Sequence, residues 1–547
     1  MVELVQMWAL VEVLGLICLP LTMTVCKNLP DRGWAFSKIV GMALLAFCVW
    51  LPLMTIQAFP FSQLFVFGVF LIILALNIYG FTRTWRTIVE TIRTHLTYVI
   101  ACELLYLGMI FLLGIIRSYN PNIQSFEMFM DEGFLAAILR SPHFPPQDMW
   151  LAGYPINYYY YAHYTIAVLA KLLNQPASIA FNTGICTFFG LTAVNIFGVT
   201  SNIVAWARHQ RLSSEGGQPR RARSGLVSRA RSSSLVPSLS KAMPFGAVSV
   251  LMGLVLGNLA STQDWWKQHD SGLPYFYWFN VSRVVPNTIN EFPAFSFLLS
   301  CFHAHVLTLA FTILAIGLAF NLFLERGNGS DDNAQGLHVF GRGWRLILNL
   351  GFTAMVLGGL FAMNGWDLPT YLGLAAVCIA LQQWMAYRSR FSFDLLLDTF
   401  TACASLTALT FFLYAPFYLN FISPAQGIGI VDAANRSSVA NEILIYGTFM
   451  FVFVSFLLIN LLRDRMPPEF SVAGLFSRKG NPGPRPFMTT LSHRSQPASG
   501  ANSTNGHARA ATDALVASGV EKVATGPVSA VAQSRQPVAA ASQPALR

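Results

Sequence analysis

Carboxylates, aromatic rings and a histidine gather in one segment of the chain, residues 117–176. Carboxylates serve as general acids and bases, whereas tyrosine and tryptophan offer an apolar face with a polar edge. A plainer interpretation is that the rings form an interfacial belt and the acids are solvated. The run FLAAIL favours a short amphipathic helix lying on a membrane over a free loop. The candidate residues are Glu127, Asp131, Glu132, Asp148, Trp150, Asn157, Tyr158, Tyr159, Tyr160 and His163.

A second group of candidates lies further along the chain and comprises Arg283, Glu291, His303 and His305. The guanidinium of Arg283 could clamp a phosphate in a bidentate fork, or it could be an interfacial arginine whose charge reaches water. His303 and His305 form only an H-x-H pair, and on a helix their side chains diverge by about 200°. We therefore expect them to hydrogen-bond to a phosphate or a carboxylate. The sequence identifies no metal ligand and no certain cofactor, and a divalent cation stays open.

Two further acids have distinct settings. Asp367 lies in the short turn NGWDLP at 364–369, where it could bind an acceptor or cap the following helix. Glu103 lies inside an apolar run, so we expect it to be a structural partner in the interior of a bundle. No P-loop, G-x-S-x-G or H-E-x-x-H motif occurs, which argues against ATP-driven chemistry. The eight cysteines form no C-x-x-C pair and are interpreted as small hydrophobic residues rather than as a disulfide framework or zinc site.

The amino-acid composition indicates that most of the chain lies in a lipid bilayer rather than in water. Of 547 residues, 54% are hydrophobic and 11% are charged, whereas soluble proteins carry about 25% charged residues. This excludes a soluble multidomain enzyme, a disordered chain and a fibrous protein. The formal net charge of +10 is carried by residues 208–241 and 463–547. These basic segments predict contact with an anionic membrane leaflet rather than with nucleic acid.

Continuous apolar runs of membrane-spanning length predict an all-α polytopic bundle of about eleven helices, within a range of 10–13. The runs do not alternate in polarity, which excludes an outer-membrane barrel. The predicted spans are 7–26, 37–56, 60–81, 95–116, 177–206, 243–260, 301–324, 345–363, 368–386, 396–418 and 443–462.

Lysines and arginines in the short loops predict the orientation. Placing Lys27, Arg83 and Arg388 in the cytoplasm puts the N-terminus and residues 117–176 outside. The segment 158–173 must then be an outer or re-entrant helix rather than a full span. The location predicted is the plasma membrane, with many passes and a cytoplasmic C-terminal tail.

The same topology divides the chain into five parts. An N-terminal three-helix extension (1–94) precedes a core segment (95–207) that carries the outer loop 117–176. A basic, disordered cytoplasmic linker (208–242) leads to a second core segment (243–466), with outer loops at 261–300, 364–367 and 419–442. A disordered cytoplasmic tail (467–547) follows.

Four motifs carry a family resemblance: MDEGFLAAILRSPHFPPQDMWLAGYPINYYYYAHY, TINEFPAFSFLLSCFHAHVLTLAFTILAIGLAFNL, NGWDLPTY and APFYLNF. Over roughly residues 95–465, the chain resembles the uncharacterised "YYY" membrane proteins of archaea and chloroflexi. That family commonly has Asp-Leu-His where this chain has Cys301-Phe302-His303. Its layout is remotely similar to that of the GT-C polytopic glycosyltransferases, with outer juxtamembrane helices.

The GT-C resemblance implies transfer of a sugar from a polyprenyl phosphate, a membrane lipid, to a glycan, lipid or protein on the outer face. Asp131 would then be the general base, with Glu132 as second choice, and Arg283, His303 and His305 would stabilise the departing phosphate. Sugar-binding residues would be Trp150, Asn157, Tyr158, Tyr159, Tyr160 and His163, with Asp148, Glu291 and Asp367 as second choices for the acceptor.

Two other classes of function remain open. A transporter or flippase for a lipid-linked or polar solute would favour paired hydropathy repeats with broken helices, and no such pairing is evident. A non-catalytic protein of envelope assembly would not need its acids and histidines to converge.

Overall fold

A computed structural model describes residues 1–124, 127–216, 237–269, 277–326, 334–423, 429, 431–432 and 436–463. Met1–Arg465 forms one compact unit, so the helices within 1–94 belong to the same unit as the rest. Most of the basic linker (217–236) and the tail 467–547 lie outside the described residues. Every regular element in the described part is a helix, and the all-α polytopic prediction is confirmed.

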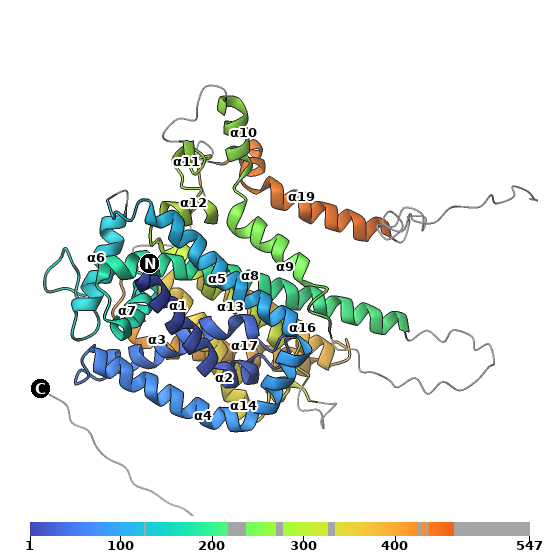
Figure 1. The fold of residues 1–547 in the computed structure, drawn as a ribbon. Helices are drawn as coiled ribbons and strands as arrows, with labels where there is room; N and C mark the ends of the chain where they lie inside the picture. Colours follow the sequence, from blue (N-terminus) through green and yellow to red (C-terminus); the bar gives the residue numbers. More distant parts are fainter. Residues whose placement is uncertain are drawn as a thin grey trace, which may run out of the picture. The chain divides into compact units, whose positions relative to one another are not determined.

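The elements follow one another along the chain as shown in Figure 1. The first half contains α1 (Val2–Ile17), α2 (Leu19–Val25), η1 (Trp34–Phe36), α3 (Ser37–Thr55), α4 (Gln63–Thr94), α5 (Leu96–Ser118), α6 (Met128–Arg140), α7 (Tyr161–Leu173) and α8 (Ala177–Gly216). The second half contains α9 (Met243–Val250), η2 (Leu251–Val255), α10 (Leu259–Gln268), α11 (Tyr277–Asn280), α12 (Pro293–Leu299), α13 (Ala304–Phe323), η4 (Gly336–Phe340), α14 (Trp344–Leu346), η5 (Ile347–Gly351), α15 (Phe352–Met363), α16 (Asp367–Ala386), α17 (Phe393–Leu413), α18 (Ala415–Tyr418) and α19 (Val439–Arg463).

The number of spans agrees with the prediction. Nine helices in the described part are long and apolar enough to cross a membrane, and two bent pairs raise the number to eleven. The first pair, α1 and α2, bends by 55°, with Pro20 in the first turn of α2 where it needs no hydrogen-bond donor. The second pair bends by 63° after Val255, and the Asn258 side chain caps α10. The predicted straight spans 7–26 and 243–260 therefore need correction.

Two other boundaries differ from the sequence prediction. Helix α4 continues through Arg83, Arg86 and Arg93 to Thr94, because no proline interrupts this stretch, and a cytoplasmic loop was expected there. Helix α17 ends at Leu413, and Pro416 lies in the separate short helix α18, so the predicted span 396–418 is two elements.

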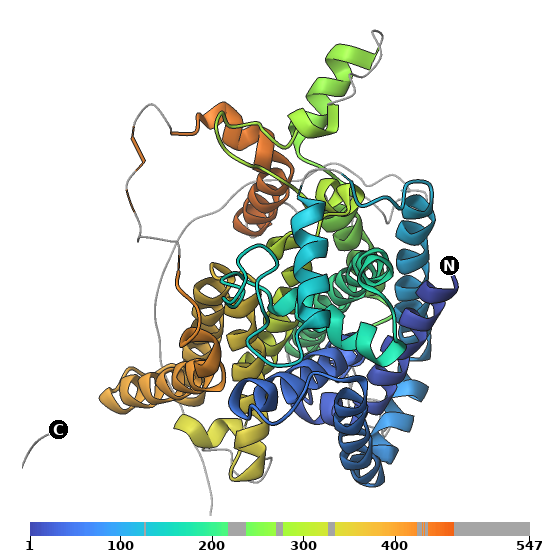
Figure 2. The ribbon, with the colours of Figure 1, turned by 90° about the vertical axis from the view of Figure 1, so that its left-hand side faces the viewer.

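Helix α7 has 13 residues, which gives a length of about 20 Å, too short for a hydrocarbon core of about 30 Å. This length agrees with the prediction that 158–173 is not a full span. Its neighbour α6 also has 13 residues and packs against α7 and α8, with Leu135 and Ile138 buried. Figure 2 looks onto the end of the bundle where α6 lies in the foreground.

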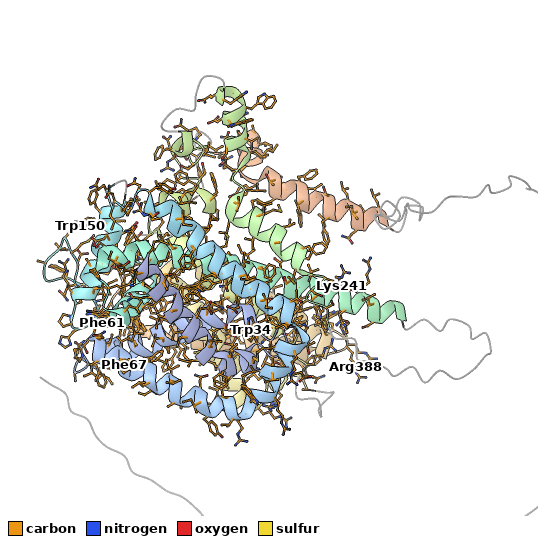
Figure 3. All side chains as sticks on the ribbon, viewed as in Figure 1. Trp34, Phe61, Phe67, Trp150, Lys241 and Arg388 are labelled. Atoms are coloured by element: carbon orange, nitrogen blue, oxygen red, sulfur yellow. The ribbon has the colours of Figure 1, made fainter. Side chains whose placement is uncertain are left out.

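Basic residues mark the opposite end of the bundle. Helix α13 begins beside His303 and ends near Glu325, whose carboxylate pairs with Lys27 at 2.9 Å. Figure 3 shows Trp150 at the α6–α7 end and both Lys241 and Arg388 at the other end. The basic loops and the candidate site thus occupy opposite ends of the described bundle.

A cluster of charged residues around the buried Lys38 lies at the interface of α1, α3 and α5, and its two carboxylates are partly exposed. The ammonium of Lys38 lies 3.2 Å from Glu12 and 2.5 Å from Glu103. Glu103 also accepts a hydrogen bond from Trp34 Nε1 at 2.8 Å. These contacts agree with the prediction that Glu103 is a structural partner, although its side chain is 34% exposed rather than enclosed in the bundle interior.

Candidate functional site

Helix α6 holds Asp131 in its first turn, where a carboxylate interacts favourably with the helix dipole. The side chain of Asp131 is 1% exposed. Its Oδ2 atom has no hydrogen-bond partner among the described residues. A buried carboxylate oxygen without a partner is costly, so this position calls for a ligand or a specific role.

His163 on α7 faces the same carboxylate. Its Nε2 atom lies 3.7 Å from Asp131 Oδ1, and the imidazole is fully buried. The ring lies between the rings of Phe134 and Phe302, each at a centroid distance of 5.8 Å. Within the described part of the chain, neither ring nitrogen makes a hydrogen bond.

The turn between α12 and α13 brings a third segment to Asp131. Ser300 adopts a left-handed conformation with φ of 61°, which ends α12 and redirects the chain. Cys301 and His303 follow this turn. One ligand atom from each of Asp131, Cys301 and His303 lies within 4.8 Å of the others. Residues about 170 positions apart therefore meet at one point.

Glu291 fixes the orientation of the His303 ring. Its Oε2 atom lies 3.0 Å from His303 Nδ1, 2.9 Å from Ser296 Oγ and 3.4 Å from His305 Nε2. Burial opposes the charged form of this carboxylate, but the contacts with His303 and His305 outweigh it and hold the pKa of Glu291 well below its usual range. Burial likewise opposes protonation of His303, yet Cys301 and Glu291 raise its pKa to about 10.

Glu127 and Asp367 complete the surroundings. Glu127 is 58% exposed, and its Oε2 atom lies 3.3 Å from His303 Nε2 without forming a hydrogen bond. Asp367 accepts a hydrogen bond from Asn364 Nδ2 at 3.0 Å and lies within electrostatic reach of His305. The side chain of Asp367 does not cap α16, so the alternative prediction that Asp367 is a helix cap is wrong.

The structure therefore brings together six of the predicted residues, with Glu127 at their edge: Asp131, His163, Glu291, His303, His305 and Asp367. Arg283 is half-buried, bonds to Ser282 and lies over the Phe279 ring at 4.5 Å. Glu132 is half-buried on α6, and its side chain makes no hydrogen bond or ion pair with another described residue. Neither residue has a contact with the cluster in the described part.

The tyrosine segment forms the wall beside this cluster. Tyr158 stacks on Phe134 at 4.9 Å, and Trp150, which is 71% exposed, lies 6.5 Å from the same ring. Tyr159 contacts Phe361 and Phe421.

Three other predicted residues have structural partners. Asn157 makes two hydrogen bonds with the backbone of Ile422, and Tyr160 is buried with its hydroxyl against Trp50 Nε1 at 3.3 Å. Asp148 accepts from the backbone amides of Trp150 and Leu151, which closes a local turn.

Sequence reasoning missed Cys301 as a site residue. It was interpreted with the other cysteines as a small hydrophobic residue, and all eight are indeed free thiols. One sequence signal could have identified it. Cys301 lies two residues before His303, at a position where the resembled family commonly has an acid.

Comparison with known proteins gives the family. Residues 44–532 match the family described as Uncharacterized membrane protein (DUF2298). The chain belongs to this family. The match starts inside α3 and extends into the tail, so it is wider at both ends than the 95–465 expected from motifs. No curated protein and no solved structure matches the chain, so the GT-C resemblance gains no support from them.

Proposed function

We propose that this member of the family is a membrane glycosyltransferase of GT-C type, which transfers a sugar from a polyprenyl phosphate to an acceptor at the outer face. The observation that carries the proposal is the meeting of Asp131 with His163 and His303 at the end of the bundle opposite the basic loops. Basic loops face the cytoplasm in most membrane proteins, which would put this cluster outside.

The reaction assigns one task to each kind of residue. Asp131 takes the proton of an acceptor hydroxyl, and the resulting oxygen attacks the anomeric carbon of the donor. The bond from that carbon to the phosphate oxygen breaks, and polyprenyl phosphate leaves. His305, which is 49% exposed, together with His303, stabilises the charge that develops on the phosphate.

A neighbouring apolar cavity suits the lipid part of the donor. It has a volume of about 320 Å³ and is lined by Tyr159, Phe361, Trp366, Leu368, Leu372 and Phe411, among others. Asp367 lies between Trp366 and Leu368 in the sequence, so the cavity adjoins the polar cluster. Trp150 and Tyr158, whose rings both lie beside that of Phe134, would stack on sugar rings.

The test is a transfer assay with radiolabelled polyprenyl-phosphate sugars and membranes that contain the full chain. Asp131→Asn removes the base but keeps the shape, and we expect transfer to fall by about 100-fold or more. The control is Asp394→Asn, because Asp394 is exposed in the first turn of α17 at the opposite end.

Unchanged transfer in Asp131→Asn would remove the catalytic assignment. A transporter would instead move the labelled lipid between leaflets without consuming the sugar donor. Measuring how much labelled product forms and how much donor is lost therefore separates the two classes. A comparison of glycolipids and glycoproteins in a deletion strain identifies the sugar and the acceptor.

A further inference from the structure

Several polar atoms around Asp131 are buried without partners. In the described part of the chain, Asp131 Oδ2, both nitrogens of His163 and His303 Nε2 make no hydrogen bond. Asp131 is 1% exposed and His163 is fully buried, so bulk water does not satisfy them. Leaving one buried polar atom unpaired costs about 1–3 kcal/mol. His163 Nε2 lies 3.7 Å from Asp131 Oδ1, and His303 Nε2 lies 3.3 Å from Glu127. The buried Asp131 Oδ2 beside them has no such neighbour in the described part of the chain and indicates a missing ligand.

The chemistry of the side chains identifies the kind of ligand. A carboxylate, a thiol and an imidazole offer one atom each within 4.8 Å of one another, from Asp131, Cys301 and His303. Oxygen, sulfur and nitrogen donors together suit zinc and similar transition metals, whereas magnesium and calcium take oxygen donors.

The surroundings of His303 favour this use of its ring. Glu291 Oε2 lies 3.0 Å from Nδ1, so Nε2 is the nitrogen left to coordinate a cation, which binds there by displacing the proton on Nε2. A carboxylate on the far nitrogen of a histidine is the usual partner of a metal ligand, because it fixes the ring and raises its basicity. Glu291 Oε2 is already in contact with Ser296 and the two histidines, so this oxygen orients His303 rather than acting as a ligand.

We infer that Asp131, Cys301 and His303 form a binding site for zinc or a similar divalent transition metal. His163, 3.7 Å from Asp131 Oδ1, orients the carboxylate. Ligand distances of about 2.0–2.3 Å require the donor atoms to lie about 3.5 Å apart, so the three side chains close around the ion. Three protein ligands leave a fourth position open, as in catalytic zinc sites.

The use of that open position rests on the proposed function. There the ion would bind the donor phosphate next to His305, while one oxygen of Asp131 coordinates and the other faces the acceptor hydroxyl. The metal site itself does not depend on the transfer reaction. A chain that binds the metal without transferring sugar would keep the site and overturn only the proposed function.

The test uses the full chain, purified in detergent without a polyhistidine tag. Elemental analysis after exposure to zinc and gel filtration should find about one tightly held zinc ion per chain. Replacement by cobalt should give a near-ultraviolet thiolate-to-cobalt absorption band, which reports coordination by a cysteine. A wild-type chain that shows neither zinc nor this band overturns the proposal without any variant.

Variants then assign the ligands. Cys301→Ser should abolish the cobalt band and lower zinc affinity by about 100-fold or more, and His303→Gln should lower affinity to a similar extent. Cys378→Ser is the matched control, because Cys378 is a free thiol on α16. Gel-filtration profiles and melting temperatures identify any variant that does not fold. A cobalt band that persists in Cys301→Ser, or disappears in Cys378→Ser, contradicts the assignment.

Discussion

Glu291 Oε2 lies 3.0 Å from His303 Nδ1, so a carboxylate that precedes α12 orients the imidazole that precedes α13. This contact yields a prediction that separates a metal partner from a simple ion pair. Glu291→Gln keeps the size of the side chain but removes its charge. We expect zinc affinity, measured by competition with a chelator, to fall by about 10–100-fold.

Glu442→Gln is the control for that measurement, since Glu442 lies in the first turn of α19. An unchanged affinity in Glu291→Gln would show that Glu291 does not support a metal ligand.

The orientation of the bundle can be measured by cysteine labelling. Trp150 is 71% exposed at the end that holds the site, so Trp150→Cys should react with a membrane-impermeant maleimide in intact cells. Lys241→Cys and Arg388→Cys, at the other end, should react only after permeabilisation. The wild-type chain gives the baseline from its own thiols. The reverse pattern would put the site in the cytoplasm and remove the outer-face reaction.

The ion cluster around Lys38 predicts a loss of stability on removal of its only lysine. Lys38→Met leaves the partly buried Glu12 and Glu103 without their cation. The free energy of unfolding should fall by about 1–3 kcal/mol, measured by denaturant titration in detergent. Arg83→Met, at an exposed position on α4, should change it by less than about 0.5 kcal/mol.

The same cluster allows an internal check. Adding Glu103→Gln to Lys38→Met removes one of the two stranded carboxylates, so part of the lost stability should return. A double variant less stable than Lys38→Met would contradict the pairing.

The apolar cavity predicts a selective effect on donor binding. Leu372→Trp would fill space beside Trp366 and Phe411. The KM for a long-chain polyprenyl donor should rise several-fold, while kcat stays within about twofold, because the reacting groups are untouched. Phe400→Trp, on an exposed part of α17, is the control. Equal effects of the two variants would show that the cavity does not hold the lipid.

Much of the fold could be predicted because hydrocarbon imposes a length on each span. The runs that became α5, α13 and the span Trp344–Met363 are continuous and apolar, so their boundaries fell close to those observed. The bends were harder, because Pro20 and Asn258 lie inside apolar stretches whose hydropathy alone does not reveal a break.

Individual residues of the candidate site could be predicted from the sequence, but their arrangement in space could not. Asp131, His163 and His303 were identified by residue type, but the pairing of Asp131 with Cys301 depends on how α6 packs against α7 and α8. Asn157, Tyr160 and Asp148 looked similar in the sequence and instead hold backbone and core contacts. A tyrosine that binds sugar and one that packs in a core have the same sequence signature.

The separation of Asp131 from Cys301 along the chain fixes an order of events during synthesis. When α6 and α7 leave the ribosome, five further α-helices of the described chain, α8 to α12, still precede the thiol of Cys301. Asp131 and His163 must therefore wait without Cys301 and His303 until α13 inserts. A nascent chain stopped before Ser300 would expose these two polar groups to cellular quality control. Capture of the cation would then mark the point at which α6 and the segment before α13 come together.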